Sequence, residues 1–146
     1  MGVLYSAIPI DSKIRRWLIS AGVPVSDRDG QAPTLRQIQA AIATLDDQAV
    51  SYSSGDDHWQ AAIDDPQPPE TGPWTILNVH GVTSPDEPCN FYFEKGWPSL
   101  IIKVVHRIAQ RCGPLCVVPD TGCPPVVVAA DSDIHEIIRT WEHITG

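Results

Sequence analysis

One histidine and the polar residues that follow it are the first candidates for chemistry in this chain. His80 directly follows the apolar run WTILNV, and Asp86, Glu87 and Cys89 come within the next nine residues. A histidine at the end of a strand can act as a general base, or it can activate a thiol nucleophile. One hypothesis is therefore an enzyme of an unrecognised family that uses His80 with Cys89 or with a carboxylate. The competing interpretation is a solvated loop histidine, because no catalytic signature surrounds these residues.

The other three cysteines are more typical of thiols packed in a core than of metal ligands or nucleophiles. Cys112, Cys116 and Cys123 follow a C-x3-C-x6-C spacing, whereas structural zinc sites usually use closely paired cysteines. A thiol nucleophile made from Cys112 and His106 would also need the two side chains to meet in space. Free cysteine behaves as a small hydrophobic residue in a core. We therefore expect reduced thiols, no metal site and no cofactor.

Other motifs with known chemistry are weak or missing. The triplet Asp120–Gly122 is similar to the catalytic triplet of aspartic proteases, but those enzymes use two such aspartates and this chain has one copy. With Pro119 in front, the same residues are typical of a β-turn, which is our prediction. The chain has no phosphate-binding glycine motif and no EF-hand spacing.

The most informative global feature is the distribution of charge. The chain of 146 residues carries a formal net charge of −8. Residues 37–94 contain no lysine or arginine, and their acids are Asp46, Asp47, Asp56, Asp57, Asp64, Asp65, Glu70, Asp86, Glu87 and Glu94. Such a segment repels nucleic acids and anionic membranes and attracts cationic partners. We therefore expect a basic protein partner and no nucleic acid or membrane.

Part of this acidic segment is the predicted partner-binding surface. It combines carboxylates with one tryptophan: Asp56, Asp57, Trp59, Asp64, Asp65 and Glu70. Charge accelerates encounter with a basic protein, and an aromatic side chain can supply a binding hot spot. The favoured hypothesis is a small acidic, non-enzymatic binding protein, in its specific form an immunity- or antitoxin-like inhibitor of a cationic protein. The alternative is that the acids only solubilise loops and that Trp59 packs inward.

The helices and strands that must position these residues are predicted from the spacing of apolar residues and from the residues that begin or end such elements. Helical spacing predicts helices capped by Asp11 or Ser12, by Thr34 with Gln37, and by Asp131 or Ser132, and a further helix that begins at Trp97-Pro98 and stops at Gly113-Pro114. Apolar and aromatic runs predict the strands 3–10, 49–53, 58–63, 74–79, 90–95, 115–118 and 125–130. The order β-α-α-β-β-β-β-α-β-β-α favours an α+β fold with a largely antiparallel sheet and helices mainly on one face.

Length and composition favour one domain over residues 1–146, with 64–73 as a flexible, acidic, proline-rich loop. The basic residues of the N-terminus follow its apolar run, unlike a secretory signal, so a cytoplasmic location is expected. A homodimer is compatible with the apolar surface that the aromatic strand could leave exposed.

Overall fold

The computed structural model describes residues 4–25, 27–45, 49–55, 58–64, 74–81, 84–122 and 124–145. Within them, four helices and one sheet of seven strands follow the predicted order. The helices are α1 (Ser12–Ser20), α2 (Leu35–Ile42), α3 (Pro98–Cys112) and α4 (Ile134–Thr145). The strands are β1 (Leu4–Pro9), β2 (Ala49–Ser54), β3 (His58–Asp64), β4 (Trp74–His80), β5 (Phe91–Gly96), β6 (Leu115–Pro119) and β7 (Val126–Val128). The predicted α+β fold is confirmed.

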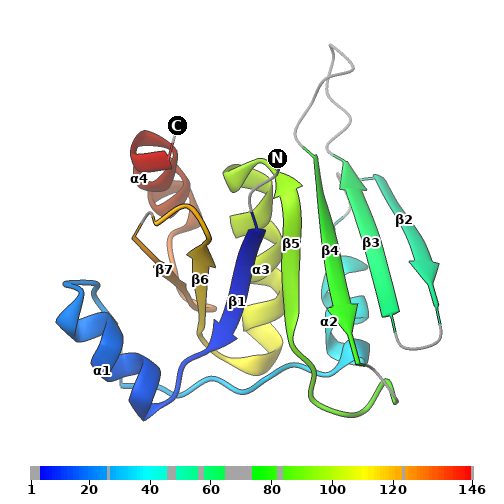
Figure 1. Ribbon diagram of the computed structural model, residues 1–146, viewed down its shortest axis with the longest axis horizontal. Coiled ribbons are helices and arrows are strands. Elements are labelled where there is room, and N and C mark those ends of the chain that lie inside the picture. The colour runs from blue at the N-terminus through cyan, green and yellow to red at the C-terminus, as the bar shows by residue number, and fades with distance from the viewer. Residues whose placement is uncertain are drawn as a thin grey trace.

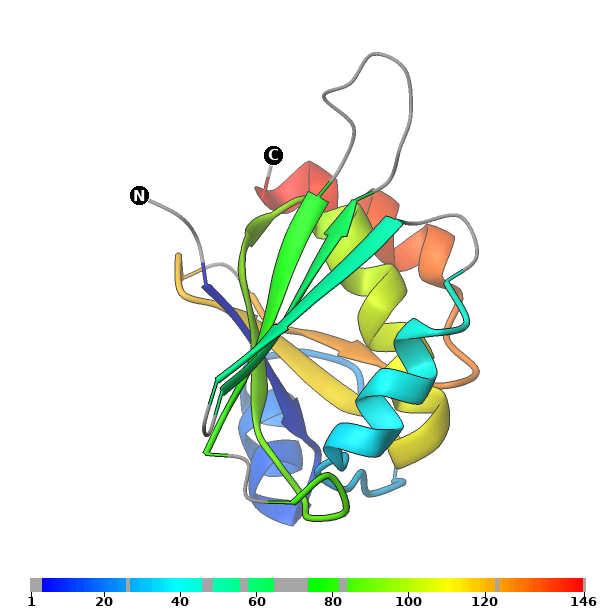
Figure 2. The same ribbon diagram turned by 90° about the vertical axis from the view of Figure 1, so that its right-hand side faces the viewer.

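The sheet has the strand order β2-β3-β4-β5-β1-β6-β7, and every neighbouring pair is antiparallel. In Figure 1 it is seen from one side, with α2, α3 and α4 behind it. The side view in Figure 2 shows these three helices forming a layer on that one face of the sheet. Helix α1 lies on the opposite side, over the β6–β7 end (Figure 1).

Local sequence signals set the helix ends. The Asp11 carboxylate accepts a hydrogen bond from the Ile14 amide at 2.8 Å and caps α1. Thr34 and Gln37 form the predicted capping box at the start of α2. Pro98 occupies the first turn of α3, where its missing N–H costs nothing. The predicted cap of α4 is wrong by a residue or two: Asp133 accepts from the Glu136 amide, while the Ser132 hydroxyl accepts from Ala129.

The core lies between the sheet and the three-helix layer. Side chains of alternating strand residues point into it and are buried, including Trp59, Leu77 and Phe93. Helix α3 contributes Leu100, Ile101, Val104, Val105 and Ile108, the stripe that the sequence predicts. A second, smaller cluster beneath α1 contains Ile10, Leu18 and Cys116. The rest of that second face has no described helix over it.

Some of the predictions concern residues that the structure does not describe. These include Asp46 and Asp47, predicted to close the second helix, which itself ends at Ile42. They also include residues 65–73 of the predicted flexible loop. No described helix is long and apolar enough to cross a membrane.

Candidate functional site on the uncovered sheet face

The candidate site lies on the sheet face opposite the three-helix layer, on the part of that face that α1 does not cover. Antiparallel register places Gln60, Asn78, Tyr92 and Ser6 in one row across β3, β4, β5 and β1. The row on one side of it pairs His58 with His80, and the row on the other side aligns Ile76, Glu94 and Leu4. Side chains opposite each other on neighbouring strands are close enough to interact.

Asn78 is the centre of a polar cluster that we define as His58, Gln60, Asn78, His80 and Tyr92. Although it lies on the face without a helix layer, Asn78 is only 2% exposed. Its Oδ1 accepts from Gln60 Nε2 at 3.0 Å and lies 3.1 Å from His58 Nε2. Because an amide oxygen carries no proton, His58 must donate there from Nε2. Asn78 Nδ2 is buried without a hydrogen-bond partner among the described residues.

Three rings of this cluster lie nearly parallel. The imidazoles of His58 and His80 stack with centroids 4.2 Å apart and planes 4° apart, and the Tyr92 ring is 7° from the plane of His80. His80 Nε2 lies 2.7 Å from the Tyr92 hydroxyl. Burial, together with the nearby Glu94 carboxylate, raises the pKa of Tyr92, so the phenol keeps its proton.

A groove of about 470 Å³ lies next to this cluster, between β1 and β5. Its lining combines apolar side chains such as Leu4 and Ile8 with polar groups of Ser6, Asn90 and Tyr92. No lysine or arginine lines it among the described residues. A depression with apolar walls and a few hydrogen-bonding groups is typical of a recognition site.

Acidic and aromatic side chains meet at the other end of the same face. Asp64 at the end of β3 is paired directly with Trp74 at the start of β4, and Glu94 is paired with Ile76. Asp64 is exposed, Glu94 is half-buried, and Trp74 is 38% exposed. We call Leu4, Asp64, Trp74, Ile76 and Glu94 the acidic–aromatic surface.

The predicted partner-binding residues divide between three places. Asp64 is on the uncovered face. Trp59 is not: it lies on the helix-covered face, is 7% exposed and belongs to the core, so the alternative that it packs inward describes its position. Asp56, Asp57, Asp65 and Glu70 lie outside the described residues. The tryptophan beside a carboxylate is Trp74, which the sequence reasoning did not select.

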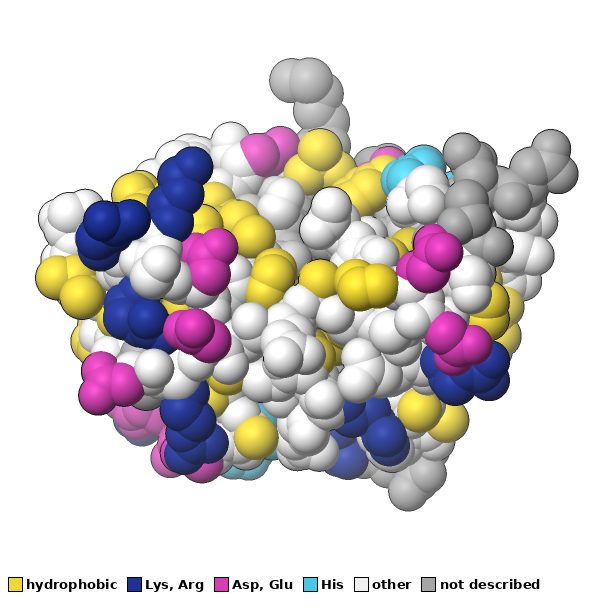
Figure 3. Space-filling model, turned by 90° about the horizontal axis from the view of Figure 1, so that it is seen from below, with side chains coloured by type: hydrophobic (Ala, Val, Ile, Leu, Met, Phe, Trp, Pro, Cys, Tyr) yellow, Lys and Arg dark blue, Asp and Glu magenta, His cyan; other side chains and the backbone are white. Residues whose placement is uncertain are grey.

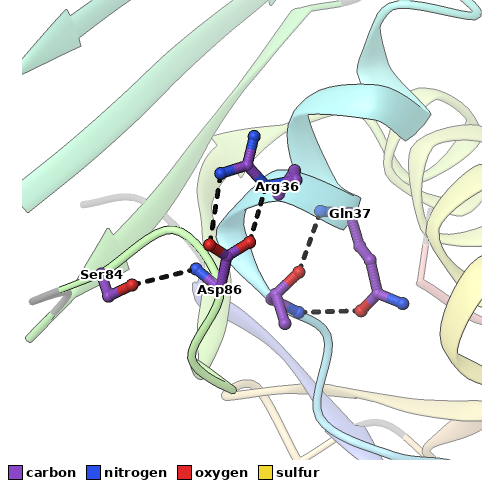
Figure 4. Close-up of polar contacts among 5 residues, drawn as sticks. Arg36, Gln37, Ser84 and Asp86 are labelled. Carbon is purple, nitrogen blue, oxygen red and sulfur yellow. Dashed lines mark hydrogen bonds and ion pairs between the residues drawn. The ribbon is translucent and has the colours of Figure 1, made fainter.

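The predicted catalytic residues Cys89, Asp86 and His80 each contact other groups in the structure. The Cys89 thiol donates to the Pro33 carbonyl at 3.3 Å, and burial raises the pKa of this thiol. Asp86 forms an ion pair with Arg36 through both carboxylate oxygens (Figure 4). His80 instead contacts His58 and Tyr92.

The residues of the second thiol pair, His106 and Cys112, also contact other groups. His106 hydrogen-bonds the Ala130 carbonyl, and the Cys112 thiol lies 3.7 Å from the Gly113 carbonyl oxygen. Burial raises the pKa of Cys112 to about 11, which keeps the thiol protonated and poorly nucleophilic.

Asp120 accepts from the Leu4 amide at the sheet end, as part of a turn. No cluster of three or more metal-ligating side chains occurs among the described residues.

Comparison with known proteins gives no further guide. No family model matches the chain, and the searches of curated proteins and of solved structures found no similar protein. The residues of the uncovered face are therefore the basis for inferring function.

Proposed function

We propose that the protein binds a basic protein partner through the uncovered sheet face, and that it acts without catalysing a reaction. The observation that carries this proposal is the direct pairing of Asp64 with Trp74 on the part of the sheet face that no described helix covers. A monomeric protein usually buries the apolar side chains of a sheet under a second layer. Exposed aromatic surface flanked by carboxylates suits a partner that brings both apolar contact and positive charge.

The charge distribution supports a partner of that sign. The strands β2, β3 and β4 contain no lysine or arginine, and the described acids Asp64 and Glu94 lie on the uncovered face. The lower end of the molecule differs, because acidic and basic side chains are intermingled there (Figure 3). Complementary charge on one surface accelerates association and selects against acidic partners.

The specific role that we propose is inhibition, as in immunity or antitoxin proteins. An acidic domain of this size can mask the active site of a cationic protein that handles nucleic acid, because such active sites present positive charge to phosphates. In that role the protein needs a stable docking face and no reactive groups of its own.

Capture of the partner from a lysate of the producing organism, followed by affinity measurement with the purified partner, tests the proposal. Trp74→Ala should weaken binding about tenfold or more, because buried aromatic anchors dominate interface energies. Combined Asp64→Asn and Glu94→Gln should lower the association rate and its dependence on salt. The inhibitory role predicts that the captured partner loses its nucleic-acid-directed activity when bound.

Trp17→Ala is the matched control, since Trp17 is 42% exposed but lies on α1. Equal binding by the wild type, Trp74→Ala and the double acid variant would contradict the proposal. So would a partner whose binding is weakened by Trp17→Ala and by none of the changes on the sheet face.

A further inference from the structure

We propose that the groove between β1 and β5 receives an arginine side chain of the partner protein, with its guanidinium group between Tyr92 and Glu94. This inference rests on the proposed function and names the chemical group that the docking face recognises. It depends on three features: the shape of the groove, its hydrogen-bonding groups, and the negative charge of Glu94, which lies opposite the groove-lining Leu4.

The shape suits a long side chain with an apolar stem. Leu4 and Ile8 lie two strand positions to either side of Ser6 on the same face of β1, and all three line the groove. The stem of an arginine can lie along such apolar side chains while its charged end stays near water. The volume of about 470 Å³ is large enough for one extended side chain and lies within the range usual for ligand sites.

The polar groups in and beside the groove can all act as hydrogen-bond acceptors. The Ser6 and Tyr92 hydroxyls and the Asn90 side-chain carbonyl line the groove, and the Glu94 carboxylate is on the residue opposite Leu4. Ser6 and Asn90 are exposed, and Ser6 is paired directly with Tyr92 across the two strands. A guanidinium group has five N–H donors and no acceptor, so it is complementary to this set.

Negative charge is the third feature, and Glu94 supplies it. Its side chain is half-buried and is paired across the strands with Leu4 on β1 and Ile76 on β4, which are both apolar. None of the described ion pairs includes Glu94. A guanidinium group in the groove would supply an oppositely charged partner for this carboxylate.

The Tyr92 ring beside the groove favours arginine over lysine as the bound side chain. A planar guanidinium stacks on aromatic faces and pairs with a carboxylate through two parallel hydrogen bonds, whereas an ammonium group is a compact, strongly hydrated charge. Tyr92 presents a ring beside the groove, and its orientation is held by the hydrogen bond and near-parallel packing with His80.

The test is an NMR titration of the intact protein with three capped amino acids: N-acetyl arginine methylamide and the corresponding lysine and citrulline compounds. A ligand of this size reaches a dissociation constant of about 1 mM, so the titration extends well above that concentration. We expect saturable shifts of the Ser6, Asn90 and Tyr92 amides with arginine, and at least about fivefold weaker binding of lysine and of neutral citrulline.

Three variants assign the contacts. Glu94→Gln should weaken arginine binding about tenfold, because the charge-assisted hydrogen bonds are lost. Tyr92→Phe keeps the ring and should weaken binding less than Tyr92→Leu, which removes it. Asp27→Asn is the matched control, because it removes the same charge from an exposed loop aspartate outside the groove.

Several outcomes would overturn the inference. They are equal shifts with all three compounds, no saturable shift with arginine, or unchanged binding in Glu94→Gln. Groove shifts that depend on protein concentration alone would identify a second copy of the chain as the occupant. If arginine fails here while Trp74→Ala still weakens partner binding, only this inference fails and the proposed docking face stands.

Discussion

The two faces of the sheet use the same strands in opposite ways. On the helix-covered face, alternating residues such as Leu77, Val79 and Phe93 are fully buried under α2 and α3. On the other face, the intervening residues Asn78, His80 and Tyr92 contact one another and leave a groove beside them. One face therefore supplies most of the buried core, while the other is the face that we propose for recognition.

The largest expected difference between the faces is at two neighbouring residues of β5. Phe93→Ala should lower the free energy of unfolding by about 3–5 kcal/mol, because it leaves a cavity in the core. Tyr92→Ala, one position along the strand, removes a ring of similar size from the half-buried face and should cost less than half as much. Urea denaturation of both variants measures the contrast. Equal losses would show that the uncovered face is packed as a core.

Leu18→Ala tests the only part of the second face that a described helix covers. Leu18 is fully buried with Ile10 and Cys116, so the change should lower the free energy of unfolding by about 2–5 kcal/mol. Burial raises the Cys116 pKa from 9.0 to about 12, so at pH 9 the native thiol is protonated and unreactive. Opening of the α1 contact restores the ordinary pKa and exposes the sulfur.

Labelling with a thiol reagent at pH 9 should therefore modify Cys116 faster in Leu18→Ala than in the wild type. The same raised pKa makes native stability fall as pH rises above 9.0 towards 12, since the unfolded thiol ionises first. Leu4→Ala, on the uncovered part of the face, is the control and should leave the Cys116 rate unchanged. Equal Cys116 rates in all three proteins would mean that α1 does not protect this end of the sheet.

Gly96→Ala should have the next largest effect, because this glycine lies at the β-bulge, where the pairing shifts from Thr75–Gly96 to Ile76–Glu94. Gly96 has φ +115°, and a Cβ there would lie 2.5 Å from the Trp74 carbonyl oxygen. Backbone strain of this kind costs about 1–3 kcal/mol. Gly55→Ala meets no atom within 4 Å and should be nearly neutral in the same thermal unfolding measurement. Equal melting temperatures for Gly96→Ala and Gly55→Ala would show that the bulge tolerates a side chain.

The smallest expected effect on stability is at the centre of the polar cluster. Asn78→Leu removes a buried amide whose Nδ2 lacks a described partner, and it should change the free energy of unfolding by about 1 kcal/mol or less. His58 and Gln60 are half-buried, so water can replace their lost hydrogen bonds. Chemical denaturation measures this. If Asn78→Leu lowered the free energy of unfolding as much as Phe93→Ala, the polar cluster would contribute to stability as strongly as the core does.

Local signals were enough to predict most of the fold. The Thr34–Gln37 capping box, Pro98 in the first turn of α3 and the apolar stripe of α3 depend on residues within a turn or two of each other. The cap of α4 was misplaced because Asp131, Ser132 and Asp133 are all good cap residues, and only the backbone path selects among them.

The candidate site was harder to predict, because an alternating strand has two faces. Trp59 and Trp74 both lie on strands next to acidic residues, but one ring is in the core and the other faces outward. Gln60, Asn78 and Tyr92 are polar residues within apolar strands, which is a signal for an exposed face. Nothing local shows that they share one row, since that depends on the register of three strands.

The sequence by itself determined the element order, most of the helix starts and the concentration of negative charge in residues 37–94, because these depend on neighbouring residues and composition. The tertiary structure decided which side of the sheet receives α2, α3 and α4. That choice put Trp59 in the core and left Trp74, Tyr92 and Glu94 on the uncovered face. The physical reason is that burial is a property of packed layers, and a strand's own sequence cannot specify which of its two sides another element will cover.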